Sequence, residues 1–233
     1  MPEPEELLAY VDHAVGHEKD MEGLRVLVTA GPTQEALDPV RYLTNHSTGT
    51  MGYAIAKAAA SRGATVTLVS GPTQLSTPVH VERVDIRSAQ DMFEAVTSRF
   101  DQQDIVIKAA AVADYRPAVQ AEEKMKKSGD DLALELVRTQ DILAWLGQHK
   151  APGQFLCGFS METQDMVENS RKKLEKKNLD LIAANNLKQE GAGFGTATNV
   201  LTLIDHQETV ELPLMSKEAA PHAWLDGILE KRS

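Results

Sequence analysis

A glycine turn and helix start stand in the segment NHSTGTMGYAIAKAAASRGATV, residues 45–66, where backbone amides could bind a phosphate group. Gly49 and Gly52 permit close backbone approach, and the alanine-rich stretch that follows can lie tightly on a sheet. We expect Ser47 and Thr48 to cap this helix, whose N-terminal amides and dipole favour an anion. A glycine pair also serves plain helix-to-sheet packing, so the phosphate hypothesis needs support from its surroundings.

Residues 31–47, GPTQEALDPVRYLTNHS, separate these glycines from the preceding strand. In a dinucleotide-binding fingerprint the glycines follow the strand directly. A long segment without clear periodicity inside a compact α/β domain is usually functional. Polar side chains of this segment should reach the carboxyl end of the first strand, where open α/β sheets bind ligands. They are Asp38, Arg41, Asn45, His46 and Ser47.

A second candidate group follows the strand predicted near residues 104–110. Asp114 stands just beyond the strand end, where a carboxylate could hold a magnesium-bound phosphate or a sugar hydroxyl. An Asx turn ahead of Pro117 would explain the same aspartate. Farther along, the KMKK cluster of Lys124, Lys126 and Lys127 has the composition of a solvated face, yet beside a nucleotide cleft it could grip phosphates.

Two lysine pairs lie on the helix predicted over residues 164–178. Its apolar stripe runs through Val167, Ser170 and Leu174. Lys173 and Lys177 flank that stripe and can reach a ligand over the sheet, whereas Lys172 and Lys176 should face solvent.

Phe159 ends another strand and offers a platform for a nucleotide base, although a core position is the better interpretation from pattern alone. The glycine-rich stretch GAGFGT, residues 191–196, precedes a hairpin pattern, so we interpret it as a turn rather than a phosphate loop. The sequence shows no paired histidine spacing of a metal site.

Alternating strand and helix patterns must position these residues. Buried strands are predicted at LRVLVTA, ATVTLVS, DIVIKAA and LDLIAANN, and helices near 49–62, 88–99 and 164–178. This alternation predicts an α/β fold: a Rossmann-like, mostly parallel sheet with helices on both faces. NVLTLID and ETVELPL, separated by His206 and Gln207, predict a C-terminal β-hairpin, followed by a helix at about 216–231. Residues 1–22 suggest a linker or lead-in helix, and 23–233 one domain.

The amino-acid composition argues against several classes of binding partner. With 24 Lys+Arg against 34 Asp+Glu the formal net charge is −10, which argues against a broad nucleic-acid-binding face. The single Cys157 excludes an intramolecular disulfide, and nothing in its strand setting suggests activation. No signal peptide or bilayer-spanning apolar run is evident. We therefore expect a cytoplasmic protein without nucleic-acid or membrane partners.

Five ordered stretches resemble those of phosphopantothenate–cysteine ligases of the bacterial, CTP-dependent type. They are TAGPTQEALDPVRYLTNHSTGTMGYAIA, AAVADYRP, KMKK, GFSMET and RKKLEKKNLDLIAANN, within about residues 23–232. The resemblance implies a Rossmann-like homodimer that joins 4′-phosphopantothenate to L-cysteine in coenzyme A biosynthesis, using CTP and Mg²⁺. The substrate carboxylate would attack the α-phosphate of CTP, releasing pyrophosphate and forming an acyl-cytidylate. The cysteine amine would then expel CMP.

The same resemblance implies residue roles. Asn45 would orient the acyl group, and Lys124 would close on the intermediate from a flexible strap; these are the catalytic residues. The implied nucleotide contacts are Lys108, Ala109 and Ala110 by backbone, and Asp114, Lys124, Gln140, Asp141, Ile142, Leu143, Phe159, Lys173 and Lys177. The implied substrate contacts are Arg41, Asn45, His46, Ser47 and Gly49. Metal ligands are not implied, and the strap and substrate loop would be completed across the dimer.

Two positions depart from the family pattern, because many bacterial members have lysine where this chain has Thr50 and proline where it has Gln140. The helix-start and nucleotide-loop contacts are affected. The opening MPEPEELLAYV resembles the junction that follows a flavin-dependent decarboxylase domain in bifunctional members. It implies a ligase half with no FMN of its own and a fused or separate decarboxylase as partner.

Three alternatives stay open. An ATP-using ligase of the eukaryotic type would share fold and chemistry. An NAD(P)-dependent reductase would share the sheet, but no glycine fingerprint abuts the first strand and no tyrosine–lysine pair has the short-chain reductase spacing. A nucleotide-binding module without catalysis would not need Asn45 and Lys124 together.

Overall fold

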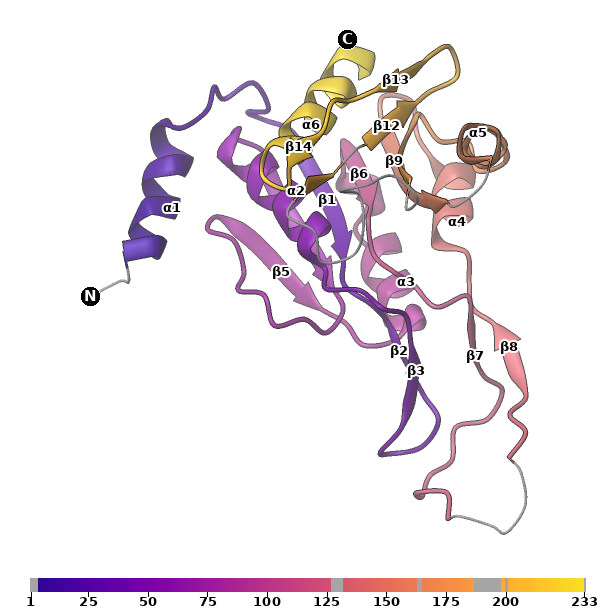
Figure 1. Cartoon of the computed structure of the whole chain (residues 1–233). Coiled ribbons are helices and arrows are strands. Elements are labelled where there is room, and N and C mark those ends of the chain that lie inside the picture. Colours follow the sequence, from indigo (N-terminus) through magenta and orange to yellow (C-terminus); the bar gives the residue numbers. More distant parts are fainter. Residues whose placement is uncertain (1–3, 127–131, 163–164, 187–197, 200, 233) are drawn as a thin grey trace.

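The computed structural model describes residues 4–126, 132–162, 165–186, 198–199 and 201–232. An eight-stranded sheet occupies the centre in the order β13-β12-β10-β9-β6-β1-β4-β5 (Figure 1). Its strands are β1 (Arg25–Ala30), β4 (Thr65–Ser70), β5 (Val81–Asp85), β6 (Ile105–Lys108), β9 (Phe155–Glu162), β10 (Leu181–Asn186), β12 (Leu201–Ile204) and β13 (Thr209–Glu211). Strands β5 to β10 along this order pair in parallel, whereas β12 and β13 pair antiparallel.

The chain leaves β1 toward one edge of the sheet through β4 and β5, then crosses back to β6 and continues toward the other edge through β9 and β10. This is the strand order of doubly wound nucleotide-binding sheets, with a switch point between β1 and β6. The sequence-based fold, including the C-terminal hairpin β12–β13, is confirmed. The switch point defines the edge at which a ligand site is expected.

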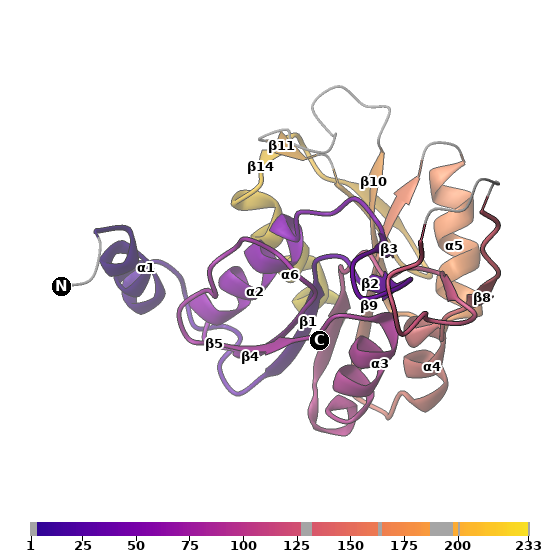
Figure 2. The same ribbon diagram turned by 90° about the horizontal axis from the view of Figure 1, so that it is seen from below.

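Helices cover both faces. They are α1 (Pro4–Val15), α2 (Thr50–Ser61), α3 (Ala89–Thr97), α4 (Ile142–His149), α5 (Met166–Lys176) and α6 (Ala219–Arg232), with a short 3₁₀ turn η1 (Phe100–Gln102). Figure 2 shows α2 and α6 on one side of the sheet and α3 and α4 on the other. Alternate β1 residues serve the two layers, since Val26 and Val28 pack with α2 and α6 whereas Leu27 packs with α3 and α4.

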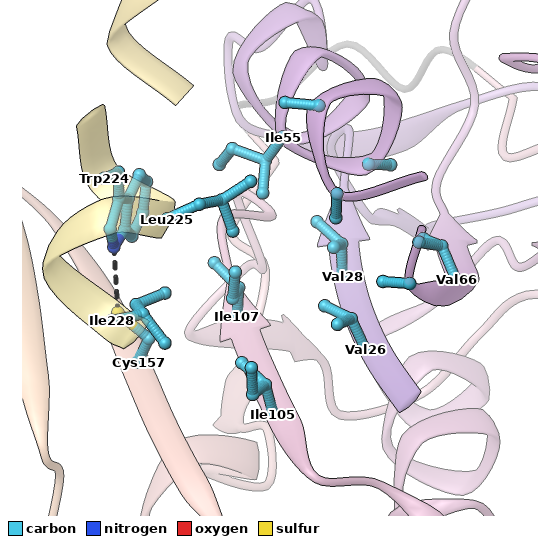
Figure 3. Packing of buried hydrophobic residues seen from close by; sticks show 14 of the residues in the cluster. Val26, Val28, Ile55, Val66, Ile105, Ile107, Cys157, Trp224, Leu225 and Ile228 are labelled. Atoms are coloured by element: carbon cyan, nitrogen blue, oxygen red, sulfur yellow. Dashed lines mark hydrogen bonds between the residues drawn. The ribbon is translucent and has the colours of Figure 1, made fainter. Parts of the chain in front are cut away.

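The core between the sheet and α6 contains the single cysteine (Figure 3). Cys157 on β9 is fully buried, and the Nε1 of Trp224 on α6 donates a hydrogen bond to its Sγ at 3.0 Å. Burial raises the pKa of the Cys157 thiol far above its ordinary value. The thiol is therefore a packing group, as its sequence setting suggested.

The start of α2 differs from the sequence-based expectation in one detail. Its N-cap is Gly49, at a φ of 77° in the left-handed region, and no side chain caps the helix. The Ser47 hydroxyl accepts from the Gly49 amide instead, and the Thr48 and Thr50 hydroxyls pair with each other at 2.8 Å. The Thr48 hydroxyl also accepts from the Thr50 amide, at 3.4 Å, so one amide of the first turn of α2 has a side-chain acceptor.

Residues 31–47 are not an aperiodic loop throughout. They contain the antiparallel pair β2 (Gln34–Ala36) and β3 (Tyr42–Thr44), whose three-residue strands are too short to give a periodic pattern. A second pair, β7 (Tyr115–Pro117) and β8 (Leu136–Arg138), lies beside it. Both extend beyond the carboxyl edge of the sheet (Figure 1). The small pair β11 (Thr198–Asn199) and β14 (Met215–Ser216) lies near α6.

The predicted helices correspond to α2, α3, α5 and α6, and the N-terminal segment contains α1. The edge strand β5 and helix α4 were missed: β5 is charged, VERVD, and α4 has only 8 residues. The boundary between 1–22 and 23–233 stays a prediction, as does the GAGFGT turn, which lies outside the described residues. Among the described helices, none has the length and apolarity to cross a bilayer.

The close packing of Gly71 against the loop after β1 can be tested by substitution. It follows β4, and a Cβ built on it would stand 1.8 Å from the carbonyl oxygen of Pro32 in the loop after β1. Backbone cannot yield as a flexible side chain does, so Gly71→Ala should destabilise the protein by roughly 1–3 kcal/mol or more. Thermal unfolding measures this change. The control is Gly227→Ala on α6, whose Cβ would meet only the Cδ1 end of Leu203; equal melting temperatures for both variants would contradict the prediction.

Candidate active site

A lysine-rich pocket of about 420 Å³ opens at the carboxyl ends of β6 and β9, between α4 and α5. The loop after β6 and the segment between β8 and α4 complete its wall. Its lining residues are Lys108, Ala110, Val112, Asp114, Tyr115, Arg138, Thr139, Gln140, Asp141, Ile142, Leu143, Phe159, Lys173 and Lys177. The structure thus brings together residues from four separate stretches of sequence at the predicted edge of the sheet.

Asp141 organises one wall of this pocket. It is the N-cap of α4, where its Oδ1 accepts from the Ala144 amide at 3.0 Å. Its Oδ2 lies 2.8 Å from the Nζ of Lys177, the C-cap residue directly after α5. Although burial opposes ionisation, hydrogen bonds from Lys177 and Ala144 lower the pKa of Asp141. The carboxylate therefore holds the helix start and one lysine in fixed positions.

The other lysines approach the same space. Lys173 donates to the carbonyl of Phe159 at 3.3 Å. Lys108, the last residue of β6, has its Nζ 3.9 Å from the sulfur of Met92 on α3. Burial lowers the pKa of Lys108 to about 7, against the attraction of Asp141 and with further lowering by Lys177 and Lys173. Lys172 and Lys176 are exposed, as predicted.

Phe159 lies between the hydrophobic core and the pocket. The ring packs against the core and stacks with Trp224 at a centroid distance of 5.8 Å and an interplanar angle of 27°. It nevertheless lines the pocket. The core interpretation is confirmed, and the ring is also available to a ligand from the pocket side.

Backbone hydrogen bonds fix the loop after β6 to the end of β1. The amide of Ala110 donates to the Thr29 hydroxyl at 3.1 Å, and the amide of Ala113 donates to the Thr33 hydroxyl at 3.0 Å. Asp114 is exposed at the pocket rim, and its carbonyl accepts from the Thr139 amide. Ala109 packs against the hydrophobic core and does not line the pocket.

Asn45 connects the hairpin β2–β3 to this loop. Its Nδ2 donates to the carbonyl of Val112, a pocket residue, at 3.1 Å. The Asn45 side chain is therefore connected to the pocket wall through Val112, although Asn45 itself does not line the pocket. His46 is exposed, and Ser47 is half-buried just before the α2 start.

Asp38 joins the hairpin turn to the segment that carries Lys124. Its buried carboxylate accepts from the amides of Val40 and Arg41, from the Arg41 guanidinium, and from the Met125 amide at 3.1 Å. Arg41 also donates to the Met125 carbonyl at 3.0 Å. These hydrogen bonds, that of Arg41 above all, hold the pKa of Asp38 far below its usual value. Asp38 is thus a structural anchor, and Arg41 is largely committed to it.

Lys124 and Lys126 are exposed on this segment and do not line the pocket, whereas Lys127 lies outside the described residues. A second cavity, of about 640 Å³, lies between β2–β3, the start of α3 and β7. Arg41, Arg87 and Arg116 line it. The sequence did not predict this cavity, because its walls come from short strands far apart in the chain.

Sequence reasoning placed Tyr115 beside Asp114 beyond the strand end, but it missed three other lining residues of the pocket: Val112, Arg138 and Thr139. The pairing of β7 with β8 explains the last two, since Tyr115 pairs with Arg138 and the Asp114 carbonyl accepts from the Thr139 amide. A strand of three residues such as LVR gives no periodic signal. Only the position of Arg138 and Thr139 directly before Gln140 could have suggested them.

The fold and the pocket define a Rossmann-like α/β domain with a lysine-lined pocket at the carboxyl edge of its sheet. The model of the family described as "DNA/pantothenate metabolism flavoprotein C-terminal domain" matches residues 21–231. The chain belongs to this family.

Its relatives include the coenzyme A biosynthesis bifunctional protein CoaBC of Vibrio cholerae, 48% identical over 233 residues, which cover 99% of this chain and 58% of that protein. The CoaBC of Bacillus subtilis is 50% identical over 223 residues, 93% of this chain and 54% of that protein. The chain therefore spans somewhat more than half the length of these relatives.

Three solved structures share the fold of this chain. The C-terminal domain of CoaBC has a TM-score of 0.77 at 44% identity, over 89% of this chain and 95% of that one. The Streptococcus pneumoniae DNA/pantothenate metabolism flavoprotein has a TM-score of 0.77 at 26% identity, over 89% and 99%. A Cab2 mutant, H337A, in complex with phosphopantothenate-cysteine shares the fold with a TM-score of 0.72 at 14% identity, over 97% and 92%.

Proposed function

We propose that this chain ligates 4′-phosphopantothenate to L-cysteine in coenzyme A biosynthesis. The observation that supports it most is the pocket of three lysines at the carboxyl ends of β6 and β9, in a chain that belongs to the same family as the C-terminal domain of CoaBC. The Asn45 amide contacts the Val112 carbonyl of the pocket wall. The Cab2 structure named above contains phosphopantothenate-cysteine, although its 14% identity carries the fold alone. The charged and polar side chains of the site suit the two chemical steps of this ligation.

Activation of the carboxylate requires positive charge around the α-phosphate of a nucleotide, and Lys108, Lys173 and Lys177 line one pocket. Pyrophosphate leaves and an acyl-nucleotide remains. The cysteine amine then attacks the acyl carbon, and the nucleoside monophosphate leaves as the amide forms. This second step needs a donor for the developing oxyanion, and we assign that role to Asn45, whose Nδ2 in this structure donates to the carbonyl of the pocket residue Val112.

We propose CTP as the nucleotide, with the base near Phe159 and the start of α4, and ATP as the alternative. Mg²⁺ typically retains waters and binds through one or two carboxylates together with substrate phosphates. Asp114 and Asp141 both line the pocket, and Asp141 is paired with Lys177. Asp114 is therefore the carboxylate that would approach a magnesium ion carried by the nucleotide. The described residues hold no group of three or more metal-ligating side chains, which fits a metal bound mainly by phosphates.

We also propose that the chain forms a homodimer. The arms β2–β3 and β7–β8 expose large apolar side chains, among them Val40 at 60%, Tyr42 at 47% and Tyr115 at 46%. Val119, Leu134 and Leu136 extend this surface. Apolar groups gathered on projecting strands are typical of an interface. Because the bifunctional relatives are longer, we further propose that a flavin-dependent decarboxylase, fused or separate, is the partner and that this chain holds no FMN.

Turnover tests the function. The protein is incubated with phosphopantothenate, cysteine, Mg²⁺ and either CTP or ATP, and the nucleotides are separated by chromatography. CMP formed only with CTP and both substrates is the expected result. AMP formed instead would retain the ligase and change the nucleotide. An absence of turnover by the folded dimer would refute the proposal.

Lys177→Met should weaken CTP binding by ~10- to 100-fold, since a hydrogen bond to a charged group contributes about 1.5–3 kcal/mol. The substitution also leaves the Asp141 carboxylate without its ion pair, facing the phosphates. Calorimetric titration of CTP measures the loss. Lys176→Met, one residue earlier and exposed, is the control; an equal effect of both variants would count against the pocket.

A further inference from the structure

Lys108 occupies an unusual position for a lysine. It ends β6, pairs in register with Thr29 and Gly158 on the adjoining strands, and reaches its Nζ to the fully buried Met92 sulfur. In the part of the chain that the structure describes, Lys108 forms no ion pair. Its ammonium group therefore lies between an apolar thioether and the pocket. A cation in that position gains little from its protein neighbours.

Charges around Lys108 come from several elements. Asp141 at the start of α4 attracts it, whereas Lys177 and Lys173 at the C-terminal end of α5 repel it. Asp114 from the loop after β6 and Arg138 from β8 line the same pocket. Asp141 is already bonded to Lys177 at 2.8 Å. The pocket thus has more cationic than anionic side chains, and an anionic ligand would neutralise the excess.

We propose that the Lys108 side chain binds a phosphate group of the nucleotide and takes up a proton as it does so. The inference rests on the proposed use of a nucleotide and adds a side-chain role to a position whose sequence-based role was backbone lining alone. Because burial lowers the pKa of Lys108 to about 7, the side chain is mostly neutral in the free protein at pH 8. A bound phosphate favours the ammonium form and raises the pKa again.

The affinity for the nucleotide should therefore depend on pH. Well below pH 7 the ammonium is already present in the free protein, and binding takes up almost no proton at Lys108. Well above pH 7 nearly every binding event must protonate this lysine, so the affinity should fall by up to about tenfold per pH unit until the pKa of the complex is reached. Lys108→Met removes this dependence, and Lys108→Arg keeps a permanent charge and removes it as well.

The experiment is isothermal titration of the whole protein with CTP and Mg²⁺ from pH 6 to 9, in two buffers of different ionisation enthalpy. Inorganic tripolyphosphate serves as a second probe. We expect wild-type protein to take up close to one proton more than Lys108→Met at pH 8. Subtracting the variant removes protonation of the ligand itself. Lys172→Met, exposed and paired with Glu168, should behave as wild type.

The outcomes separate the two proposals. CTP binding with equal proton uptake by wild type and Lys108→Met overturns the role of Lys108 and leaves the nucleotide proposal standing. If tripolyphosphate binds with proton uptake that depends on Lys108, but CTP does not bind, the nucleotide proposal is overturned and the phosphate-binding role of Lys108 stands. Binding of neither probe overturns both. Thermal unfolding checks each variant, and Lys108→Gln replaces Lys108→Met if the latter does not fold.

Discussion

Asn45→Asp is expected to reduce amide formation by roughly 10²- to 10³-fold, the usual effect of removing one oxyanion donor. In the structure Asn45 Nδ2 donates to the Val112 carbonyl at the pocket edge. Aspartate has nearly the same shape, but it cannot donate and it adds a negative charge where the oxyanion would form. CTP should still bind, because the three pocket lysines are unchanged.

A single-turnover assay with radiolabelled CTP measures this loss in the rate of amide formation. We expect pyrophosphate release to exceed release of CMP, because activation precedes the step that needs the donor. Gln102→Glu makes the same amide-to-carboxylate change at an exposed position on η1 and is the control. Product formed by Asn45→Asp at the parent rate would refute the role of Asn45 and favour a binding module.

Lys124→Met is expected to lower the overall rate by about 10²-fold or more, because the variant loses a positive charge that would close on the acyl-nucleotide. Lys124 is exposed and stands outside the pocket wall, while its neighbour Met125 is fixed by Asp38 and Arg41. The lysine must therefore reach the intermediate by closure of its segment or from the partner of a dimer. Either route leaves CTP binding to the free protein largely intact.

Steady-state rates and a CTP titration together test whether Lys124 acts in catalysis without contributing to CTP binding. Lys126→Met, two residues on and also exposed, removes an equal charge and should have a much smaller effect. If Lys124→Met lost CTP affinity in proportion to its rate, Lys124 would belong to the nucleotide pocket alone. Parent activity in Lys124→Met would exclude the catalytic role.

Long, strongly patterned elements of this fold were predictable from sequence. β1, β4 and β10 are apolar on both sides because helices cover both faces of the sheet, and such runs identify central parallel strands. The edge strand β5, with Glu82 and Arg83 inside it, lacks this signal. The three-residue strands of β2–β3 and β7–β8 are held by tertiary contacts, which include the Asp38 hydrogen bonds. Such contacts cannot be inferred from local pattern.

Of the pocket lysines, the side chains of Lys173 and Lys177 were predictable from sequence, whereas that of Lys108 was not. Helical spacing placed Lys173 and Lys177 on the flank that the pocket uses. The side chain of Lys108 was not predicted to matter, since nothing local reveals that Met92 lies beside it. Ser47 and Thr48 were expected to cap α2, yet Gly49 occupies the cap in a conformation that a side chain would oppose.

The Trp224–Cys157 contact has a consequence for a protein proposed to use free cysteine. Solutions of cysteine contain its disulfide, cystine, and an accessible thiolate would attack that disulfide and become blocked. Cys157 is 0% exposed, carries the Trp224 indole N–H on its sulfur, and has a raised pKa. It supplies almost no thiolate and no path for attack. The chain's own sulfur is thereby kept out of thiol–disulfide exchange with the amino acid that the protein is proposed to consume.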